Sequence, residues 1–161
     1  MKCKQELTTN APKYMKCLNN NPLFNIKNTP DYAILQQRFN GWPDFHDSEI
    51  LKLSLKRSKK ISGIGPVLSL VVHASNVQYA KDDPRRNYSY VTLRFHDVDR
   101  LKLEEFNYQN VINYLTLSSI KKISPQGQRT RVELGGGFGI SCSFCCAQIE
   151  VASVVAAPPI S

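Results

Sequence analysis

The sequence predicts an α+β fold, in which one N-terminal helix accompanies a mostly antiparallel β-sheet of about six or seven strands. Apolar and polar residues alternate in several short segments after residue 50, as in strands that bury one face. Helical spacing of apolar residues occurs once, in the segment before them. No helix of crossover length separates the strand-like segments, which argues against a parallel sheet.

The domain organisation follows from length and composition. A chain of 161 residues, 42% hydrophobic and 21% charged, is ordinary for one soluble globular domain. Residues 1–29 show no periodicity and predict a loose N-terminal arm, whereas residues 30–161 predict a single α+β domain. No apolar run approaches the ~20 residues that span a bilayer, and the N-terminus lacks a secretory apolar region. We therefore expect a cytoplasmic protein without a membrane partner.

The one predicted helix covers about residues 30–39. Thr29 would cap its start, and Pro30 would occupy the first helical position. Three apolar side chains then recur at helical spacing, which predicts that they form the buried face: Tyr32, Leu35 and Phe39.

The first strands are predicted from alternation of side chains. In residues 51–55 every second residue is leucine, so Leu51, Leu53 and Leu55 should face the core together. Residues 67–73 form a denser apolar run typical of a central strand. In residues 91–95 the apolar members again share one parity, and this strand should continue after a bend near Asp97 through residues 101–103.

The C-terminal half predicts further strands with turns between them. Residues 106–111 are compatible with one helical turn, and residues 114–120 return to strand composition. A turn is expected at Pro125–Gly127. A strand starting at Arg131 should break at the glycines 135–137, in a hairpin connection. Residues 141–155 predict one long strand, or two strands with a bulge.

Two segments carry the most distinctive chemistry. The first, Phe39–Ile50, holds the only Trp, Trp42, followed by a histidine and several carboxylates. The second, Phe95–Asp97, repeats the Phe-His-Asp tripeptide of Phe45–Asp47. One interpretation is structural: His46 and Asp47 bond the backbone between helix and strand, while Trp42 and Phe45 cap the core.

The other interpretation is a metal site, since imidazole and carboxylate suit iron, manganese or zinc. Its ligands would be His46, Asp47, Glu49, His96 and Asp97. On a strand, however, Asp47 and Glu49 share a face while His46 points the other way, so the first segment does not present all three together. We favour the structural interpretation and expect no metal and no cofactor.

Other catalytic motifs lack support in the sequence. Cys142 and Cys145 have the spacing of half a zinc or redox site, but no second pair stands nearby, which favours small buried side chains on a strand. Strand formers follow the glycines 135–139, whereas a dinucleotide-binding loop would precede a helix. No Gly-x-Ser-x-Gly motif occurs. The residues therefore favour a binding protein, not an enzyme.

The chain has a formal net charge of +8, which would attract nucleic acid or an acidic surface. The basic residues lie in short clusters beside Gly, Pro, Ser or Asn, which predicts solvated loops and strand ends: residues 56–60, 85–86, 121–122 and 129–131. Aromatic residues do not interleave with them as in single-strand binding surfaces. A basic nucleic-acid-binding accessory protein is therefore the alternative function.

A family resemblance supports the binding interpretation. Over roughly residues 39–155 the chain resembles the immunity protein 50 family of bacterial polymorphic-toxin systems. Four short segments carry the resemblance by their order and spacing: Phe39–Ile50, Val91–Val98, Phe106–Val111 and Phe144–Val151.

The resemblance implies a cytosolic immunity protein that binds and neutralises a cognate toxin, by direct protein–protein interaction and without a cofactor. An inhibitor of a basic toxin is usually acidic, because complementary potentials speed encounter. Either the toxin has an acidic face, or a local patch around Asp44, Asp47 and Glu49 binds it. The candidate contacts are polar groups beside an aromatic anchor: Trp42, Asp44, Asp47, Glu49, His96 and Asp97.

Overall fold

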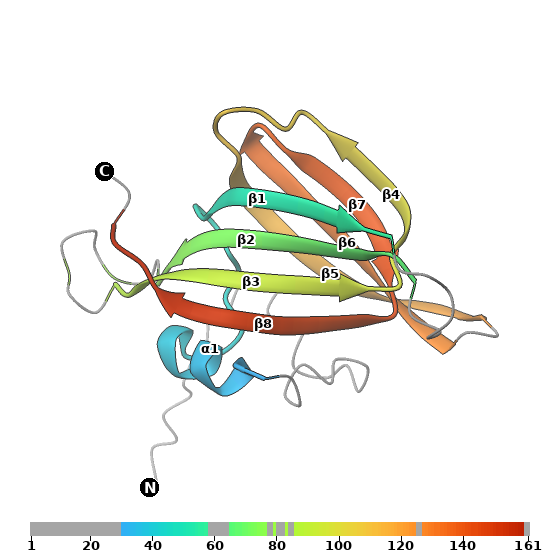
Figure 1. The fold of residues 1–161 in the computed structure, drawn as a ribbon, viewed down its shortest axis with the longest axis horizontal. Coiled ribbons are helices and arrows are strands. Elements are labelled where there is room, and N and C mark those ends of the chain that lie inside the picture. The colour runs from blue at the N-terminus through green and yellow to red at the C-terminus, as the bar shows by residue number, and fades with distance from the viewer. Residues whose placement is uncertain are drawn as a thin grey trace, which may run out of the picture.

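The computed structural model describes residues 30–57, 65–76, 79, 83, 86–124 and 127–159 (Figure 1). The arm expected at residues 1–29 and the turn residues 125–126 lie outside them. The described chain contains one α-helix and eight strands, one or two strands more than predicted. These elements are α1 (Tyr32–Phe39), β1 (Glu49–Lys56), β2 (Val67–Ser75), β3 (Tyr88–His96), β4 (Asp99–Glu104), β5 (Val111–Ser124), β6 (Gly127–Phe138), β7 (Ser141–Cys146) and β8 (Gln148–Ala156).

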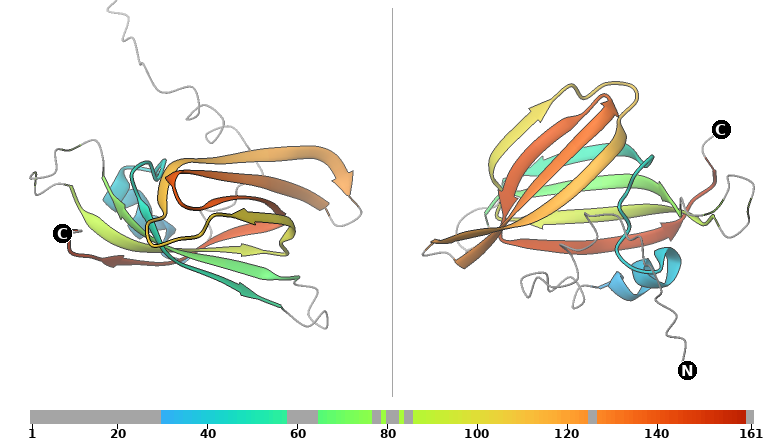
Figure 2. Two further views of the ribbon diagram at one scale, coloured as in Figure 1. Left: turned by 90° about the horizontal axis from the view of Figure 1, so that it is seen from above. Right: turned by 180° about the vertical axis from the view of Figure 1, so that it is seen from behind.

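All strand pairs are antiparallel, which confirms the predicted fold class. The sheet has the order β4-β7-β6-β5-β1-β2-β3-β8. Its two halves join at one place, where Glu49 of β1 pairs with Val111 of β5. From this joint the halves diverge into two four-stranded layers that lie face to face, β1-β2-β3-β8 and β4-β7-β6-β5 (Figures 1 and 2).

The chain crosses between these layers twice. After β3 it turns at Asp97, whose backbone is left-handed at φ 56°, and β4 then pairs with β7 at the far end of the sheet. The bend predicted near Asp97 is thus correct, but it carries the chain into the other layer. Residues 141–155 likewise form two strands, β7 and β8, which belong to different layers. Between them, the N–H of Ala147 donates to the carbonyl of His96 at 2.9 Å.

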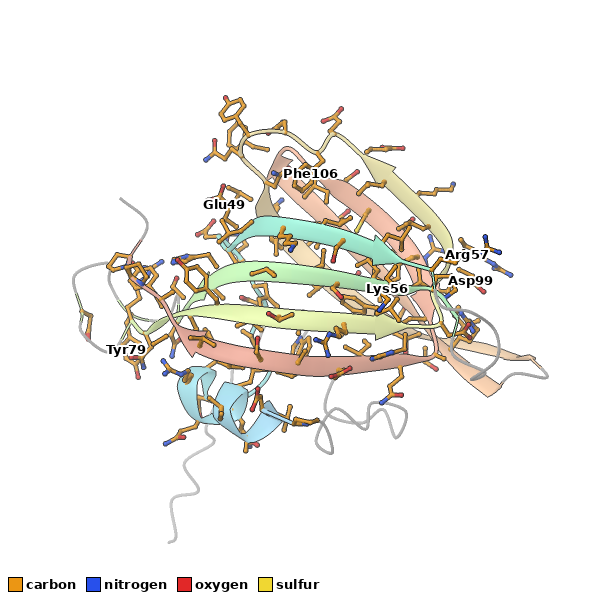
Figure 3. The ribbon with its side chains drawn as sticks, in the orientation of Figure 1. Glu49, Lys56, Arg57, Tyr79, Asp99 and Phe106 are labelled. Carbon is orange, nitrogen blue, oxygen red and sulfur yellow. The ribbon has the colours of Figure 1, made fainter. Side chains whose placement is uncertain are left out.

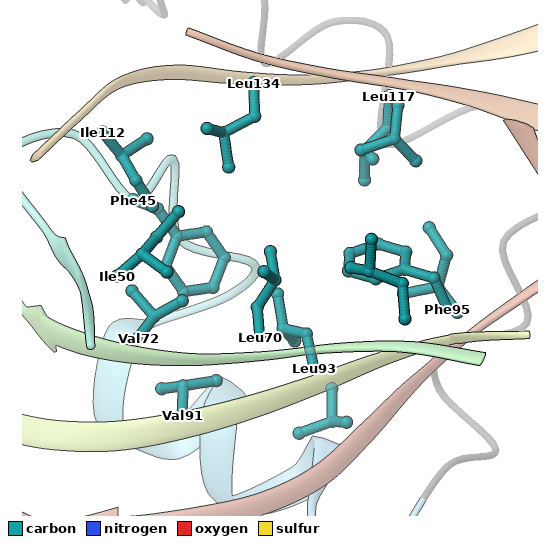
Figure 4. Close-up of a cluster of buried hydrophobic side chains, with 14 of the residues drawn as sticks. Phe45, Ile50, Leu70, Val72, Val91, Leu93, Phe95, Ile112, Leu117 and Leu134 are labelled. Carbon is teal, nitrogen blue, oxygen red and sulfur yellow. The ribbon is translucent and has the colours of Figure 1, made fainter. Parts of the chain in front are cut away.

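The core fills the space between the layers (Figure 4). Val91, Leu93 and Phe95 point inward from β3 and are fully buried, as their shared parity predicts. Across the core the rings of Phe95 and Phe144 meet edge to face, with centroids 4.9 Å apart. Burial of each such large side chain stabilises the fold by about 1.5–3 kcal/mol.

The helix α1 covers the part of the β1-β2-β3-β8 layer that the second layer leaves free, beside β8 (Figure 2). Leu35 and Phe39 are buried as predicted, and Tyr32 packs partly against the core. The helix begins at Tyr32, two residues later than expected. Asp31 precedes it in a left-handed conformation, with no side-chain cap, so Pro30 lies outside the helix.

Two predicted elements are wrong because tertiary contacts outweigh local pattern. A bulge between Ile50 and Lys52 removes Leu51 from the parity of the other leucines and leaves it 48% exposed. Of the other two, Leu53 packs partly against the core, but Leu55 is 54% exposed. Residues 106–110 form a loop with no helical turn, because side-chain hydrogen bonds to the backbone compete with a helix there.

The predicted break of the strand at glycines 135–137 is also wrong, since β6 continues through them to Phe138. The ring of Tyr114 on neighbouring β5 lies over Gly135, where a Cβ would come within 2.3 Å of it. Glycine therefore serves close packing within the strand, not a turn. The turn comes later, at Gly139, whose φ is +80°.

Candidate protein-binding surface

The segment between α1 and β1 places aromatic rings inward and carboxylates outward. Trp42 and Phe45 meet edge to face with centroids 5.6 Å apart; Phe45 is buried and Trp42 packs partly on the core. The exposed Asp44 accepts a hydrogen bond from the backbone N–H of His46 at 3.0 Å. His46 in turn pairs with Asp47, Nδ1 to Oδ1 at 3.1 Å. The expected core cap is thus present, but Asp44 makes the backbone bond assigned to His46 and Asp47.

Backbone hydrogen bonds attach this segment to the start of β5. The N–H of Asp47 donates to the carbonyl of Ile112 at 3.0 Å, and the N–H of Ile112 donates to the carbonyl of Ser48 at 2.8 Å. The N–H of Ile50 donates to the carbonyl of Asn110 at 2.9 Å. Residues 47–50 and 110–112 therefore lie side by side at the joint of the two layers.

The loop before β5 is organised by one buried amide, Asn110. Its Oδ1 accepts the N–H groups of Asn107 at 3.0 Å and Ile140 at 3.2 Å, while its Nδ2 donates to the carbonyl of Asn107 at 2.6 Å. With its backbone so held, the loop exposes two aromatic side chains. Phe106 is 50% exposed and Tyr108 is 96% exposed.

A third exposed ring comes from the end of β6. Phe138 is 69% exposed and pairs with Val111, the same residue that pairs with Glu49. Gly139 follows, and a Cβ there would lie 2.2 Å from the carbonyl oxygen of Gln109. This close approach brings the turn after β6 against the loop before β5.

Three segments far apart in the sequence thus converge at one end of the molecule. We call this surface the acidic–aromatic end and define it by three carboxylates and three exposed rings. Figure 3 shows Glu49 and Phe106 at this end, where the loop before β5 adjoins the start of β1. Its residues are Asp44, Asp47, Glu49, Phe106, Tyr108 and Phe138.

The structure places the six predicted contact residues in two groups. Trp42, Asp44, Asp47 and Glu49 belong to or underlie the acidic–aromatic end. His96 and Asp97 lie at the opposite end of β3. Glu49 is level with Tyr90 through the β1–β2 and β2–β3 pairings, and His96 lies six residues further, which is ~20 Å along the strand.

His96 and Asp97 each have partners within the chain. His96 Nε2 lies 2.6 Å from Glu150 Oε2, and Arg94 contacts the same carboxylate group at 3.2 Å. Asp97 pairs with the guanidinium of buried Arg129, Nη1 to Oδ2 at 2.6 Å. These contacts join β3 to β8 and β3 to β6.

Arg129 was expected in a solvated basic cluster, but this expectation is wrong, because Arg129 lies buried within β6. Burial lowers the pKa of its guanidinium, but the hydrogen bond to Asp97 and the charges of Asp99 and Asp97 outweigh burial, so the pKa is raised overall. Two other arginines also have internal partners: Arg86 donates to the carbonyl of Tyr79 at 3.0 Å, and Arg131 pairs with Glu133 at 2.8 Å.

The described cysteines are buried, as their strand pattern predicts. Burial raises the pKa of the Cys142 thiol to about 11 and that of Cys146 to about 12, so both are protonated at neutral pH. Burial also raises the pKa of Cys145. Within the described ranges, no three His, Cys, Asp or Glu side chains gather as metal ligands would. Cys3 and Cys17 lie outside those ranges.

Sequence reasoning missed Phe106, Tyr108 and Phe138 as surface residues. Apolar residues are more often buried than exposed, so composition alone assigns such rings to the core. The available signal was their setting, since polar residues, Glu105, Asn107 and Gln109, flank the first two and glycines flank the third.

Aromatic side chains are enriched in surfaces that bind another protein, and polar groups form the rim of such surfaces. The described chain contains no helix long and apolar enough to cross a membrane. The chain belongs to the immunity protein 50 family, whose sequence model matches residues 32–155. No curated protein and no solved structure matches it.

Proposed function

We propose that this immunity protein binds and neutralises a cognate toxin in the bacterial cytosol, and that the acidic–aromatic end is its main contact surface. Family membership supports the class of partner. The choice of surface is supported by one observation. Two segments that carry the family resemblance lie side by side there, Phe39–Ile50 and Phe106–Val111. Binding alone would block the toxin, by occlusion or by holding it inactive, and needs no cofactor.

The chemistry of the surface defines the kind of toxin face it fits. Aromatic side chains bury large area at low entropic cost and dominate many interfaces. Three carboxylates beside them favour a basic toxin face, although the whole chain carries +8. Charges more than about 8 Å apart are largely screened at physiological salt, so the local patch decides encounter more than the net charge.

The two predicted contacts at the other end of β3 remain part of the proposal. A standard interface covers about 800 Å² per partner, which corresponds to a disc roughly 30 Å across. One toxin could therefore reach from Glu49 to His96 and Asp97, which are separated by ~20 Å along the strands. Of the two groups, we expect the acidic–aromatic end to contribute more, because its rings and carboxylates are more exposed.

The alternative, nucleic-acid binding by basic loops, has less support. Arg86, Arg129 and Arg131 are held in contacts within the chain and would have to break them to bind phosphate. Nucleic-acid binding would weaken steeply with salt, because counterion release dominates such affinity.

The test is an affinity pull-down of the tagged protein from nuclease-treated lysate of its source cells, followed by binding measurements on the protein recovered. Phe106→Ala together with Tyr108→Ala should weaken toxin binding at least tenfold, about 1.4 kcal/mol, without lowering thermal stability. Tyr114→Ala is the matched control, since Tyr114 is as exposed as Phe106 but lies within β5 and is not part of the acidic–aromatic end. Recovery of nucleic acid alone from untreated lysate, with no protein from the nuclease-treated lysate, would contradict the proposal, and so would equal losses from both variants.

A further inference from the structure

Among the described residues, strand β1 is paired along only one of its sides. It pairs with β2 from Glu49 to Lys56, whereas on the other side it meets β5 only at Glu49. Beyond that point no described residue pairs with it, and Leu51 and Leu55 are 48% and 54% exposed. Alternate residues of an edge strand direct their N–H and C=O groups away from the sheet. We call residues 51–56 the open edge.

The side chains of the open edge select what could pair with it. Lys52 and Lys56 share the outer face of the layer with Ser54, while Leu53 and Leu55 share the inner face, as the register with β2 shows. A strand added here would meet lysines on one face and leucines on the other. Its sequence would therefore alternate acidic and apolar side chains.

We propose that the open edge receives an extended, acidic segment of the toxin as an added strand. The identity of this partner rests on the proposed function. β1 starts at Glu49, within the acidic–aromatic end, so the open edge continues directly from that surface, and one toxin can contact both (Figure 3). The basic open edge complements the acidic–aromatic end, and together they bind a partner whose surface carries both charges.

A second copy of this chain fits the edge poorly. In the antiparallel pairing centred on Ser54, which keeps the leucine faces of both copies on the same side of the sheet, Lys52 of each copy faces Lys56 of the other. Like charges directly opposite each other are destabilising. The lysines therefore oppose self-association, as edge lysines commonly do, while they admit an acidic strand.

Strand β4, the edge strand of the other layer, is less suited to an added strand. A bulge between Asp99 and Lys102 leaves β4 a regular ladder only from Lys102 to Glu104, whereas that of β1 runs from Lys52 to Lys56. The charged residues of β4 have both signs, with Lys102 and Glu104 on the same outer face. It therefore supplies a control for charge changes on β1.

The test uses NMR on the isotope-labelled full chain and a blocked heptapeptide that alternates glutamate and valine. We expect chemical-shift changes and slower amide exchange at residues 51–56, and at least tenfold weaker binding of the peptide in which lysine replaces glutamate. Lys52→Glu with Lys56→Glu should reverse this preference, whereas Lys102→Glu should leave it unchanged. Equal binding of both peptides, or no change at residues 51–56, would overturn the proposal. The proposal would also be overturned if those amides of residues 51–56 that point away from β2 were already protected in the free chain, as a monomer or as a dimer.

The same exchange measurement with the recovered toxin separates the two proposals. Protection of residues 51–56 supports the added strand. A toxin that protects residues 106–110 but leaves residues 51–56 exchanging freely overturns the added strand and keeps the proposed function. If the glutamate peptide binds the edge but the chain binds no toxin, the proposed function fails, and with it the toxin as occupant.

Discussion

Replacing Asn110 by Ala tests how the acidic–aromatic end is built. The substitution removes an acceptor for two N–H groups, those of Asn107 and Ile140, and a donor to one carbonyl. Each hydrogen bond contributes about 1 kcal/mol net, and the buried N–H of Ile140 would lose its partner at a cost of about 1–3 kcal/mol. We expect a loss of about 2–4 kcal/mol in the free energy of unfolding.

Urea unfolding followed by circular dichroism measures this loss, and in a thermal scan it corresponds to a melting temperature about 6–12 °C lower. Asn110→Asp keeps the acceptor but buries a carboxylate and places its second oxygen against the carbonyl of Asn107, so it should also destabilise the protein at neutral pH. Asn113→Ala is the control, because Asn113 is exposed on β5 and should change stability by no more than about 0.5 kcal/mol. If Asn110→Ala cost as little as this control, other contacts would have to hold the loop of Phe106 and Tyr108.

Three further predictions concern the scaffold. Gly139→Ala should cost more than about 2 kcal/mol, because φ is +80° and a backbone oxygen blocks the Cβ, whereas Gly137→Ala, with open space around it, should be nearly neutral; urea midpoints compare them. Stability should fall as pH rises from 9 towards 11, because the unfolded thiol of Cys146 ionises before the folded one, and Cys146→Ala should flatten this fall, measured by urea unfolding across that range. Arg129→Met should lower the unfolding free energy by about 2 kcal/mol, since it leaves two partner carboxylates unpaired; an unchanged melting temperature would argue against a stabilising ion pair.

The sequence predicts the local elements well where one face of a strand is buried along its length. Val91, Leu93 and Phe95 show this, because period-2 alternation depends only on which side of the strand the core lies. It fails at Leu51, where the bulge next to the joint with β5 shifts the parity, and at Leu55, which keeps the predicted parity but is 54% exposed. The glycine-rich end of β6 fails for a related reason, since the ring that requires glycine at 135 comes from another strand. Contacts between strands decide both cases, and no local pattern reports them.

The candidate site likewise consists of residues that the sequence could indicate and residues that only the fold brings together. The segment Phe39–Ile50 was recognisable from its rare residues, and the structure places Asp44, Asp47 and Glu49 at one surface. The exposed rings at 106, 108 and 138 depend on Asn110 and Gly139 meeting across two turns, which only the fold reveals. His96 and Asp97 repeat the local tripeptide, yet the antiparallel order of β1, β2 and β3 puts them ~20 Å away along the strands.

The single joint between the layers accounts for both proposed contact surfaces. Because β1 and β5 pair only at Glu49 and Val111, the ends of both layers meet there, and the loops before β5 and after β6 are brought beside the segment that precedes β1. For the same reason β1 departs from β5 beyond Glu49, and no described residue pairs with the outer side of its remaining residues. A longer β1–β5 ladder would cover the open edge, so a variant that extended this pairing should lose the added strand while it retains the acidic–aromatic end.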